Sequence, residues 1–138
     1  MKATLSKSLE LRIPADIRYI SLVRRGVRNL AESAGFAREE VADVEVAVSE
    51  AVTNSVEHGS PEGDTAIVVV KCRTSGDCLE VEIEDQSKAD SLPPCPTCCD
   101  PKEERGRGVL MMYRLMDECE GSRTEGGMRI RMAKQRGR

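Results

Sequence analysis

The fold of this chain is decided by residues 41–59, which read V-A-D-V-E-V-A-V-S-E-A-V-T-N-S-V-E-H-G. At about 100° per residue, the valines at every third or fourth position line one side of a helix, while Glu50 and Asn54, about 40° apart, share the opposite side. Small residues such as Ala47 and Ala51 surround this acid and amide, where a surface helix would carry Lys and Arg. We therefore expect this second side of the helix to be half buried.

A half-buried carboxylate and carboxamide need partners, because burying an unpaired polar group costs free energy. A phosphate group with a bound Mg²⁺ would be such a partner. An amide carbonyl can ligate this hard cation, and a carboxylate one turn away can orient or deprotonate a nucleophile. The alternative is a solvated polar face, since similar pairs are common on helix surfaces. Glu50 and Asn54 alone do not decide between these two interpretations.

The composition limits the class of protein. The length of 138 residues suits a single domain with one core, and we expect residues 1–138 to form it. With 21 Lys and Arg against 24 Asp and Glu, and with no Trp and one Phe, direct binding of nucleic acid is disfavoured. The sequence contains neither a secretion signal nor an apolar run long enough to cross a bilayer, so we expect a cytoplasmic protein without membrane contact.

Apolar periodicity predicts two elements before the organising helix. Residues 7–13 alternate between polar and apolar, which indicates a half-buried strand that ends at Pro14. From Asp16 onwards, apolar residues recur at helical spacing as far as Gly35. The arginines of this helix predict a solvated flank or a docking surface for an acidic partner: they are Arg18, Arg24, Arg25 and Arg28. The organising helix then begins near residues 38–40 and ends at residues 59–61.

Two strands are predicted after it. Residues 65–73 form a short β-branched run, and residues 78–85, C-L-E-V-E-I-E-D, alternate between apolar and acidic. Asp85 falls on the apolar side of this second strand. A carboxylate in that position either marks a break of the alternation at the strand's end or is directed at an enclosed ligand.

The last third of the chain begins with a long segment without periodicity, residues 86–105, as expected of a functional loop. The glycines of R-G-R-G, residues 105–108, precede a helical apolar pattern from Val109 to Met116, and glycines at a helix start let an anion reach free backbone N–H groups. After Gly121 we expect a turn through residues 124–127 and a strand at residues 128–132. If that strand lies beside the strand at residues 79–85, the arginines of the former face the glutamates of the latter. The basic tail, residues 134–138, is expected to fray.

An acid and amide on a helix, an inward Asp ending a strand, and a loop running into a Gly-x-Gly helix start occur here in one order. This order resembles the Bergerat-fold ATP-binding superfamily, and most closely its anti-sigma-factor serine/threonine kinases. The segment S-E-A-V-T-N-S-V-E-H-G, residues 49–59, is similar to the family's N box. The segment E-R-G-R-G-V-L-M-M-Y-R-L-M-D-E, residues 104–118, is similar to its phosphate-binding box. The resemblance implies an α+β fold, a two-layer α/β sandwich whose mixed, mostly antiparallel sheet is covered on one face by about three helices, with an ATP lid at about residues 86–105.

The resemblance also implies a site for ATP and Mg²⁺. Asn54 would ligate a Mg²⁺ that bridges the phosphates, Glu50 would be the general base, and Asp85 would accept a hydrogen bond from the adenine amino group. The phosphate-binding box would contribute backbone N–H groups and cationic side chains, and a histidine of the N box would lie near the nucleotide. These residues are Gly106, Gly108, Arg107, the catalytic Arg105, and His58.

One segment departs from the family pattern. The adenine box usually reads Asp-x-Gly-x-Gly, whereas residues 85–89 read D-Q-S-K-A and lack both glycines. Ser87 resists backbone conformations that Gly permits. Affinity for adenine is therefore the property that this difference affects most.

The cysteines indicate free thiols or metal ligands rather than disulfides, because no secretion signal is present. Cys95, Cys98 and Cys99 form a Cys-x-x-Cys-Cys cluster inside the predicted lid. A closed zinc site needs four ligands, and no second Cys or His pair follows. Reduced thiols in a flexible loop and a zinc site are the two interpretations, and metal analysis of protein purified without chelators separates them.

The resemblance implies an anti-sigma factor that sequesters a sigma factor and phosphorylates a serine or threonine of a small antagonist protein, and it favours a homodimer. The alternative is a catalytically inactive binding module that regulates a partner protein. The missing adenine-box glycines favour this module, while the intact Glu50 and Asn54 oppose it. A detached ATP-binding domain of a histidine kinase is disfavoured, because His58 is the single His and no phosphoacceptor helix precedes the domain.

Overall fold

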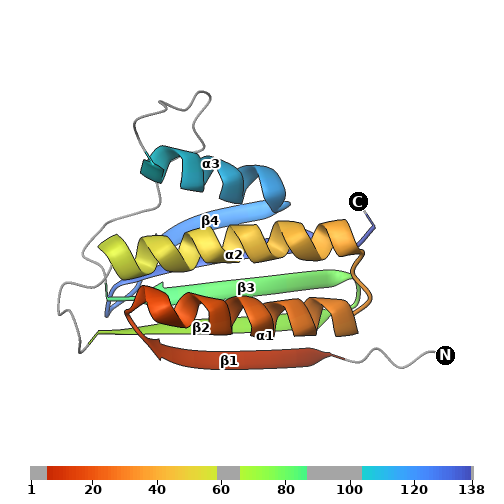
Figure 1. Cartoon of the computed structure of the whole chain (residues 1–138), viewed down its shortest axis with the longest axis horizontal. Coiled ribbons are helices and arrows are strands. Elements are labelled where there is room, and N and C mark those ends of the chain that lie inside the picture. The colour runs from red at the N-terminus through yellow and green to blue at the C-terminus, as the bar shows by residue number, and fades with distance from the viewer. Residues whose placement is uncertain (1–5, 59–65, 87–103, 138) are drawn as a thin grey trace.

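The computed structural model describes residues 6–58, 66–86 and 104–137, and the side chains of residues 58 and 104–108 are outside its description. The chain forms two layers, a five-stranded sheet and a layer of helices on one face of it (Figure 1). In chain order the elements are β1 (Lys7–Pro14), the 3₁₀ turn η1 (Ile17–Tyr19), α1 (Ile20–Ser33), α2 (Arg38–His58), β2 (Ile67–Ser75), β3 (Cys78–Asp85), α3 (Glu104–Leu115), β4 (Glu118–Arg123) and β5 (Met128–Gln135). The predicted α+β sandwich with three α-helices is confirmed.

The strand order is β1-β2-β3-β5-β4. Every pairing among the described strands is antiparallel, so the expectation of a mixed sheet is wrong for this part of the chain. The strands β2 and β3 form a hairpin whose turn contains Gly76 at φ 60°, a left-handed conformation that glycine adopts at little cost. β5 then pairs with the other edge of β3 and sets Met128 opposite Asp85.

The core lies between the sheet and the helices. The predicted valine stripe of α2 is buried, with Val44, Val48 and Val52 fully inaccessible, and Val81 and Ile83 of β3 are equally inaccessible. Fully burying a side chain of this size contributes about 1.5–3 kcal/mol. This packing holds α2 against the sheet, and α2 also packs on α1 and α3.

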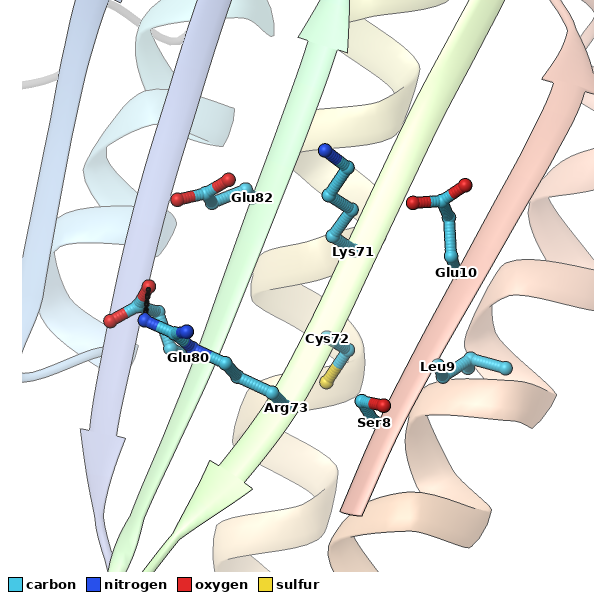
Figure 2. A pocket seen from close by; sticks show the side chains of 8 residues that line it. All are labelled: Ser8, Leu9, Glu10, Lys71, Cys72, Arg73, Glu80 and Glu82. Atoms are coloured by element: carbon cyan, nitrogen blue, oxygen red, sulfur yellow. Dashed lines mark hydrogen bonds and ion pairs between the residues drawn. The ribbon is translucent and has the colours of Figure 1, made fainter. Parts of the chain in front are cut away.

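The opposite face of the sheet carries the charged side chains. As predicted, the arginines of β5 meet the glutamates of β3, with Arg131–Glu80 and Arg129–Glu84 nitrogen–oxygen distances of 2.9 Å each. This face has a hollow of about 370 Å³, in which Arg73 lies 3.2 Å from Glu80. Figure 2 shows the side chains that line it. None of the predicted site residues lines this hollow.

One strand was missed by the sequence interpretation. β4 occupies residues 118–123, so Gly121 lies inside a strand rather than before a turn. The segment is mostly exposed and polar, and among the described strands it pairs with β5 alone. Its strand conformation depends on this pairing and has no apolar alternation to reveal it. The predicted turn at residues 124–127 is confirmed, with the N–H of Thr124 donating to the carbonyl of Gly127 at 2.8 Å.

The prediction that residues 134–138 fray is wrong as far as residue 137. Lys134 and Gln135 belong to β5, and Arg136 Nη1 donates to the carbonyl oxygen of Ala34 at 3.0 Å. The N–H of Gly137 donates to Glu40 Oε2 at 2.7 Å. Ala34 caps the C-terminus of α1, where carbonyl groups lack helical partners, so a cationic side chain is stabilised there.

Candidate functional site

Three element ends meet at one end of the molecule. The last turn of α2, the end of β3 and the first turn of α3 all lie on the left in Figure 1. The helix α2 packs directly on both β3 and α3. Residues that are far apart in sequence, at the end of the N box, in the adenine box and in the phosphate-binding box, are thereby brought to the same region.

Two ion pairs show which flank of α2 faces which helix. Arg28 of α1 contacts Glu45 on one flank of α2. On the other flank, Lys134 lies 3.5 Å from Asp43 and donates to the carbonyl of Leu115, the last residue of α3. Glu50 follows Asp43 by two helical turns, so it and Asn54 lie on the flank directed at α3.

The polar side of α2 is half buried, as the sequence predicts. Glu50 and Asn54 have intermediate exposure, and the neighbouring Ala47 and Ala51 are fully buried. Asn54 Nδ2 is buried and has no hydrogen-bond partner among the residues that the structure describes. Such a group costs about 1–3 kcal/mol when it stays unsatisfied. A bound ligand would remove this cost.

The amide of Asn54 can bind either a phosphate oxygen or a Mg²⁺ ion. Rotation by about 180° about the last side-chain bond exchanges the amide nitrogen and oxygen. The buried position can therefore present a donor to a phosphate oxygen or a carbonyl ligand to Mg²⁺. The chemistry of this donor, with the Glu50 carboxylate one turn away, fits a magnesium-bound phosphate.

Asp85 continues the inward alternation of β3. The apolar residues before it, Leu79, Val81 and Ile83, are fully buried, and Asp85 is 8% exposed on the same side of the strand. The carboxylate therefore points to the helix layer, and the alternation does not break at the strand's end. The sequence left open whether Asp85 breaks the alternation or points inward, and in the structure it points inward.

The start of α3 differs from the expectation. The helix begins at Glu104, so Gly106 and Gly108 lie within its first two turns instead of preceding it. The first N–H groups of a helix lack helical partners, so Gly106, the third residue, retains a free backbone donor by position. Gly108 lies in the second turn, where backbone N–H groups take part in helical bonds.

Several predicted site residues are outside the described part of the chain. These are the side chains of His58, Arg105 and Arg107, the lid residues 87–103, and within it Cys95, Cys98 and Cys99. Among the residues that are described, no three His, Cys, Asp or Glu side chains lie together as candidate ligands for a metal ion. Of the predicted site residues, the structure describes Glu50 and Asn54 on α2, Asp85 at the end of β3 and the backbone at the start of α3, on elements that pack against one another.

One residue at this site was not identified from the sequence. Gly127 approaches the backbone of Asp85 so closely that a Cβ atom at position 127 would lie 1.9 Å from the Asp85 carbonyl oxygen. The sequence contains only the pair Gly126-Gly127, which is typical of a turn. Nothing in that pair distinguishes a turn residue from one in contact with a neighbouring strand.

Comparisons with known proteins agree with this geometry. Residues 13–134 match the family described as the histidine kinase-like ATPase domain. The serine-protein kinase RsbW of Bacillus pumilus is 32% identical over 137 residues, which cover 91% of this chain and 84% of the relative. The serine-protein kinases RsbW of Listeria monocytogenes and Bacillus subtilis are 32% and 30% identical over similar shares of the chain.

Solved structures share the fold. The crystal structure of the RsbU and RsbW domains of a Mycobacterium tuberculosis protein superposes with a TM-score of 0.73 at 22% identity. The match covers 96% of this chain and 33% of the other chain. A histidine kinase domain from Erythrobacter litoralis superposes with a TM-score of 0.56 at 19% identity over 89% of this chain and 61% of that one.

The fold, the site and the family match define the class, and the chain belongs to the histidine kinase-like ATPase family. Within that class, relatives that are 30–32% identical to this chain include serine-protein kinases named RsbW. The predicted superfamily and the predicted class of enzyme, an ATP-dependent serine/threonine protein kinase of the anti-sigma type, are confirmed. In the described part of the chain, no helix combines the length and the apolar character that a membrane span requires.

Proposed function

We propose that the flank of α2 facing α3, together with Asp85 and the start of α3, binds ATP with Mg²⁺. The observation that carries this proposal is the buried Asn54 Nδ2 atom, which lacks a hydrogen-bond partner in the part of the chain that the structure describes, with the Glu50 carboxylate one turn away. Asn54 would hold the Mg²⁺, whose charge neutralises the phosphates. Asp85 would accept a hydrogen bond from the adenine amino group.

The chain's own residues would then position the reaction. Glu50 takes the proton of the acceptor hydroxyl as the acceptor oxygen bonds to the γ-phosphorus and ADP leaves with the bridging oxygen. The free N–H groups at the start of α3 orient the phosphates. Further phosphate contacts come from the backbone N–H of Gly106 and from the side chains of Arg105 and Arg107. The lack of a side chain at Gly108 lets the phosphates approach this turn closely, and His58 lies near the nucleotide. Positioning and charge neutralisation supply most of the rate enhancement in phosphoryl transfer.

The partners follow from the class of protein. The chain acts in the cytoplasm as an anti-sigma factor that holds a sigma factor, and it phosphorylates a serine or threonine of a small antagonist protein. It works as a homodimer, and residues 1–138 form one domain. The resemblance to anti-sigma kinases and the identity with RsbW proteins support these assignments.

Thermal unfolding with and without nucleotide tests the site. At about 100 times its Kd, ATP with Mg²⁺ should stabilise the fold by about 2.7 kcal/mol, and Asn54→Ala should remove most of the shift in Tm. Asn29→Ala, on the exposed face of α1, is the matched control and should keep the full shift. A wild-type Tm that does not respond to millimolar nucleotide would overturn the proposal.

A binding module without catalysis is the second candidate. The adenine-box residues D-Q-S-K-A, which lack both usual glycines, are the observation that favours it. Incubation with γ-labelled ATP and a small antagonist protein separates the two candidates. Labelled antagonist identifies the kinase, whereas a stable complex without label identifies the module.

A further inference from the structure

Gly127, the residue directly before β5, lies in unusually close contact with the end of β3. Gly127 is buried, and a Cβ atom on it would lie 1.9 Å from the carbonyl oxygen of Asp85 and 2.6 Å from the Cα atom of Gln86. Both atoms belong to the backbone. No side-chain rotation can relieve such a contact, so any larger residue at position 127 must displace either the end of β3 or the turn that precedes β5.

The neighbouring glycine shows that this requirement is specific to position 127. A Cβ atom on Gly126 would meet nothing within 4 Å. Neither residue is among the glycines with positive φ, so neither needs glycine for its backbone conformation. Gly127 is therefore required for steric reasons alone, and Gly126 is a matched neighbour without that requirement.

Hydrogen bonds hold both sides of this contact in place. The N–H of Gly127 donates to Thr124 Oγ1 at 3.0 Å, and the N–H of Thr124 donates to the Gly127 carbonyl at 2.8 Å, which closes the turn before β5. On the other side of β3, the N–H of Ile67 donates to Gln86 Oε1 at 3.4 Å. The end of β3 is thus enclosed between the start of β2 and the start of β5.

This enclosed segment carries the Asp85 carboxylate. Asp85 pairs with Met128 across β3 and β5, directly beside Gly127, and its side chain is directed at the helix layer. A hydrogen bond from a nucleobase amino group needs a donor–acceptor distance of about 2.7–3.2 Å. A displacement of about 1 Å at this strand end would therefore weaken or remove it.

We infer that Gly127 is a positioning residue for base recognition: by allowing β5 to approach the Asp85–Gln86 peptide, it sets the place of the Asp85 carboxylate and so the preference for adenine over guanine. This inference rests on the proposed ATP site. Gly127 does not touch the nucleotide, and it acts through Asp85.

The test compares Gly127→Ala with Gly126→Ala in binding of ATP and GTP by titration calorimetry with Mg²⁺. For Gly127→Ala we expect the ATP affinity to fall about tenfold, because one hydrogen bond to a charged group is lost. The GTP affinity should change little. The ratio of the two affinities should fall by the same factor. Gly126→Ala should keep the wild-type ratio. A general loss of stability would lower both affinities together and leave the ratio unchanged.

A readout without nucleotide accompanies this measurement. The backbone amide resonances of Asp85 and Gln86 should shift in ligand-free Gly127→Ala and stay in place in Gly126→Ala. If Gly127→Ala does not fold, Thr124→Val decides, because it removes the side-chain acceptor of the Gly127 N–H without adding an atom at the contact. It should lower the ATP-to-GTP ratio by a smaller factor.

The outcomes separate this inference from the proposed site. A wild-type protein that binds no ATP contradicts both. A wild-type protein that prefers ATP, with an unchanged ratio in folded Gly127→Ala or, failing that, in Thr124→Val, overturns the role of Gly127 alone. A lower ratio in these variants with the wild-type ratio in Gly126→Ala supports it.

Discussion

Lys134 Nζ donates a hydrogen bond of 2.6 Å to the carbonyl oxygen of Leu115. Leu115 is the last residue of α3, where carbonyl groups lack helical partners and a positive charge is favourable. The same ammonium group lies 3.5 Å from Asp43 of α2, and its side chain is 12% exposed. One lysine of β5 therefore ties the ends of the two helices that form the walls of the proposed site.

We expect Lys134→Met to lower the free energy of unfolding by about 1–3 kcal/mol, because a half-buried, charge-assisted hydrogen bond is lost. Chemical denaturation measures this change. Lys71→Met, on the exposed face of the sheet, is the control and should have little effect. Equal stabilities of the two variants would contradict the structural role of Lys134.

Glu40 should contribute to the dependence of stability on pH. Its pKa is lowered from the ordinary value of 4.5 because the carboxylate accepts hydrogen bonds from the backbone N–H groups of Ala37 and Gly137. A carboxyl group with a lower pKa in the folded state stabilises the fold above its unfolded pKa. That contribution is lost as the pH falls below 4.5 and through the folded value.

Glu40→Gln should therefore make the stability less sensitive to acid below pH 4.5 while lowering it at neutral pH. Urea denaturation at several pH values measures both effects. Glu39→Gln removes one carboxylate from the same helical turn and controls for the change of net charge. If the free energy of unfolding depends on pH in the same way in both variants, the hydrogen bonds of Glu40 do not contribute to the pH dependence of stability.

Cys72 should resist thiol reagents in the folded protein. Burial in β2 raises the pKa of its thiol to about 12, so almost no reactive thiolate exists at neutral pH. We expect Cys72 to remain unlabelled under native conditions and to be labelled in denaturant. Peptide mapping by mass spectrometry identifies the modified cysteines. Native labelling of Cys72 as fast as that of the less buried Cys119 would contradict this prediction.

Glu50→Gln should separate catalysis from nucleotide binding. If Glu50 accepts the proton of the acceptor hydroxyl, phosphate transfer should fall by about 10²–10⁴-fold while the stabilisation by ATP persists. Glu39→Gln, an exposed residue at the other end of α2, should retain wild-type transfer. A Glu50→Gln protein with normal transfer would exclude Glu50 as the general base.

The sequence by itself determined the elements whose apolar residues repeat with a regular period. The valine stripe of α2 and the alternation of β3 state which side of each element is buried, because a residue's position within one element follows from local geometry. The half-buried side of Glu50 and Asn54 was predictable for the same reason, whereas the alternation left two interpretations of Asp85 open, and the structure decided for the inward direction. The family motifs then related these residues to ATP.

Only the tertiary structure decided the features that depend on contacts between distant segments. The polar β4 becomes a strand by pairing with β5, and Arg136 is held by Ala34, which precedes it by 102 residues. The contact of Gly127 with Asp85 has the same origin. A local period records which face of an element is buried, but it carries no information on which other segment covers that face, and this choice is made by packing of the whole chain.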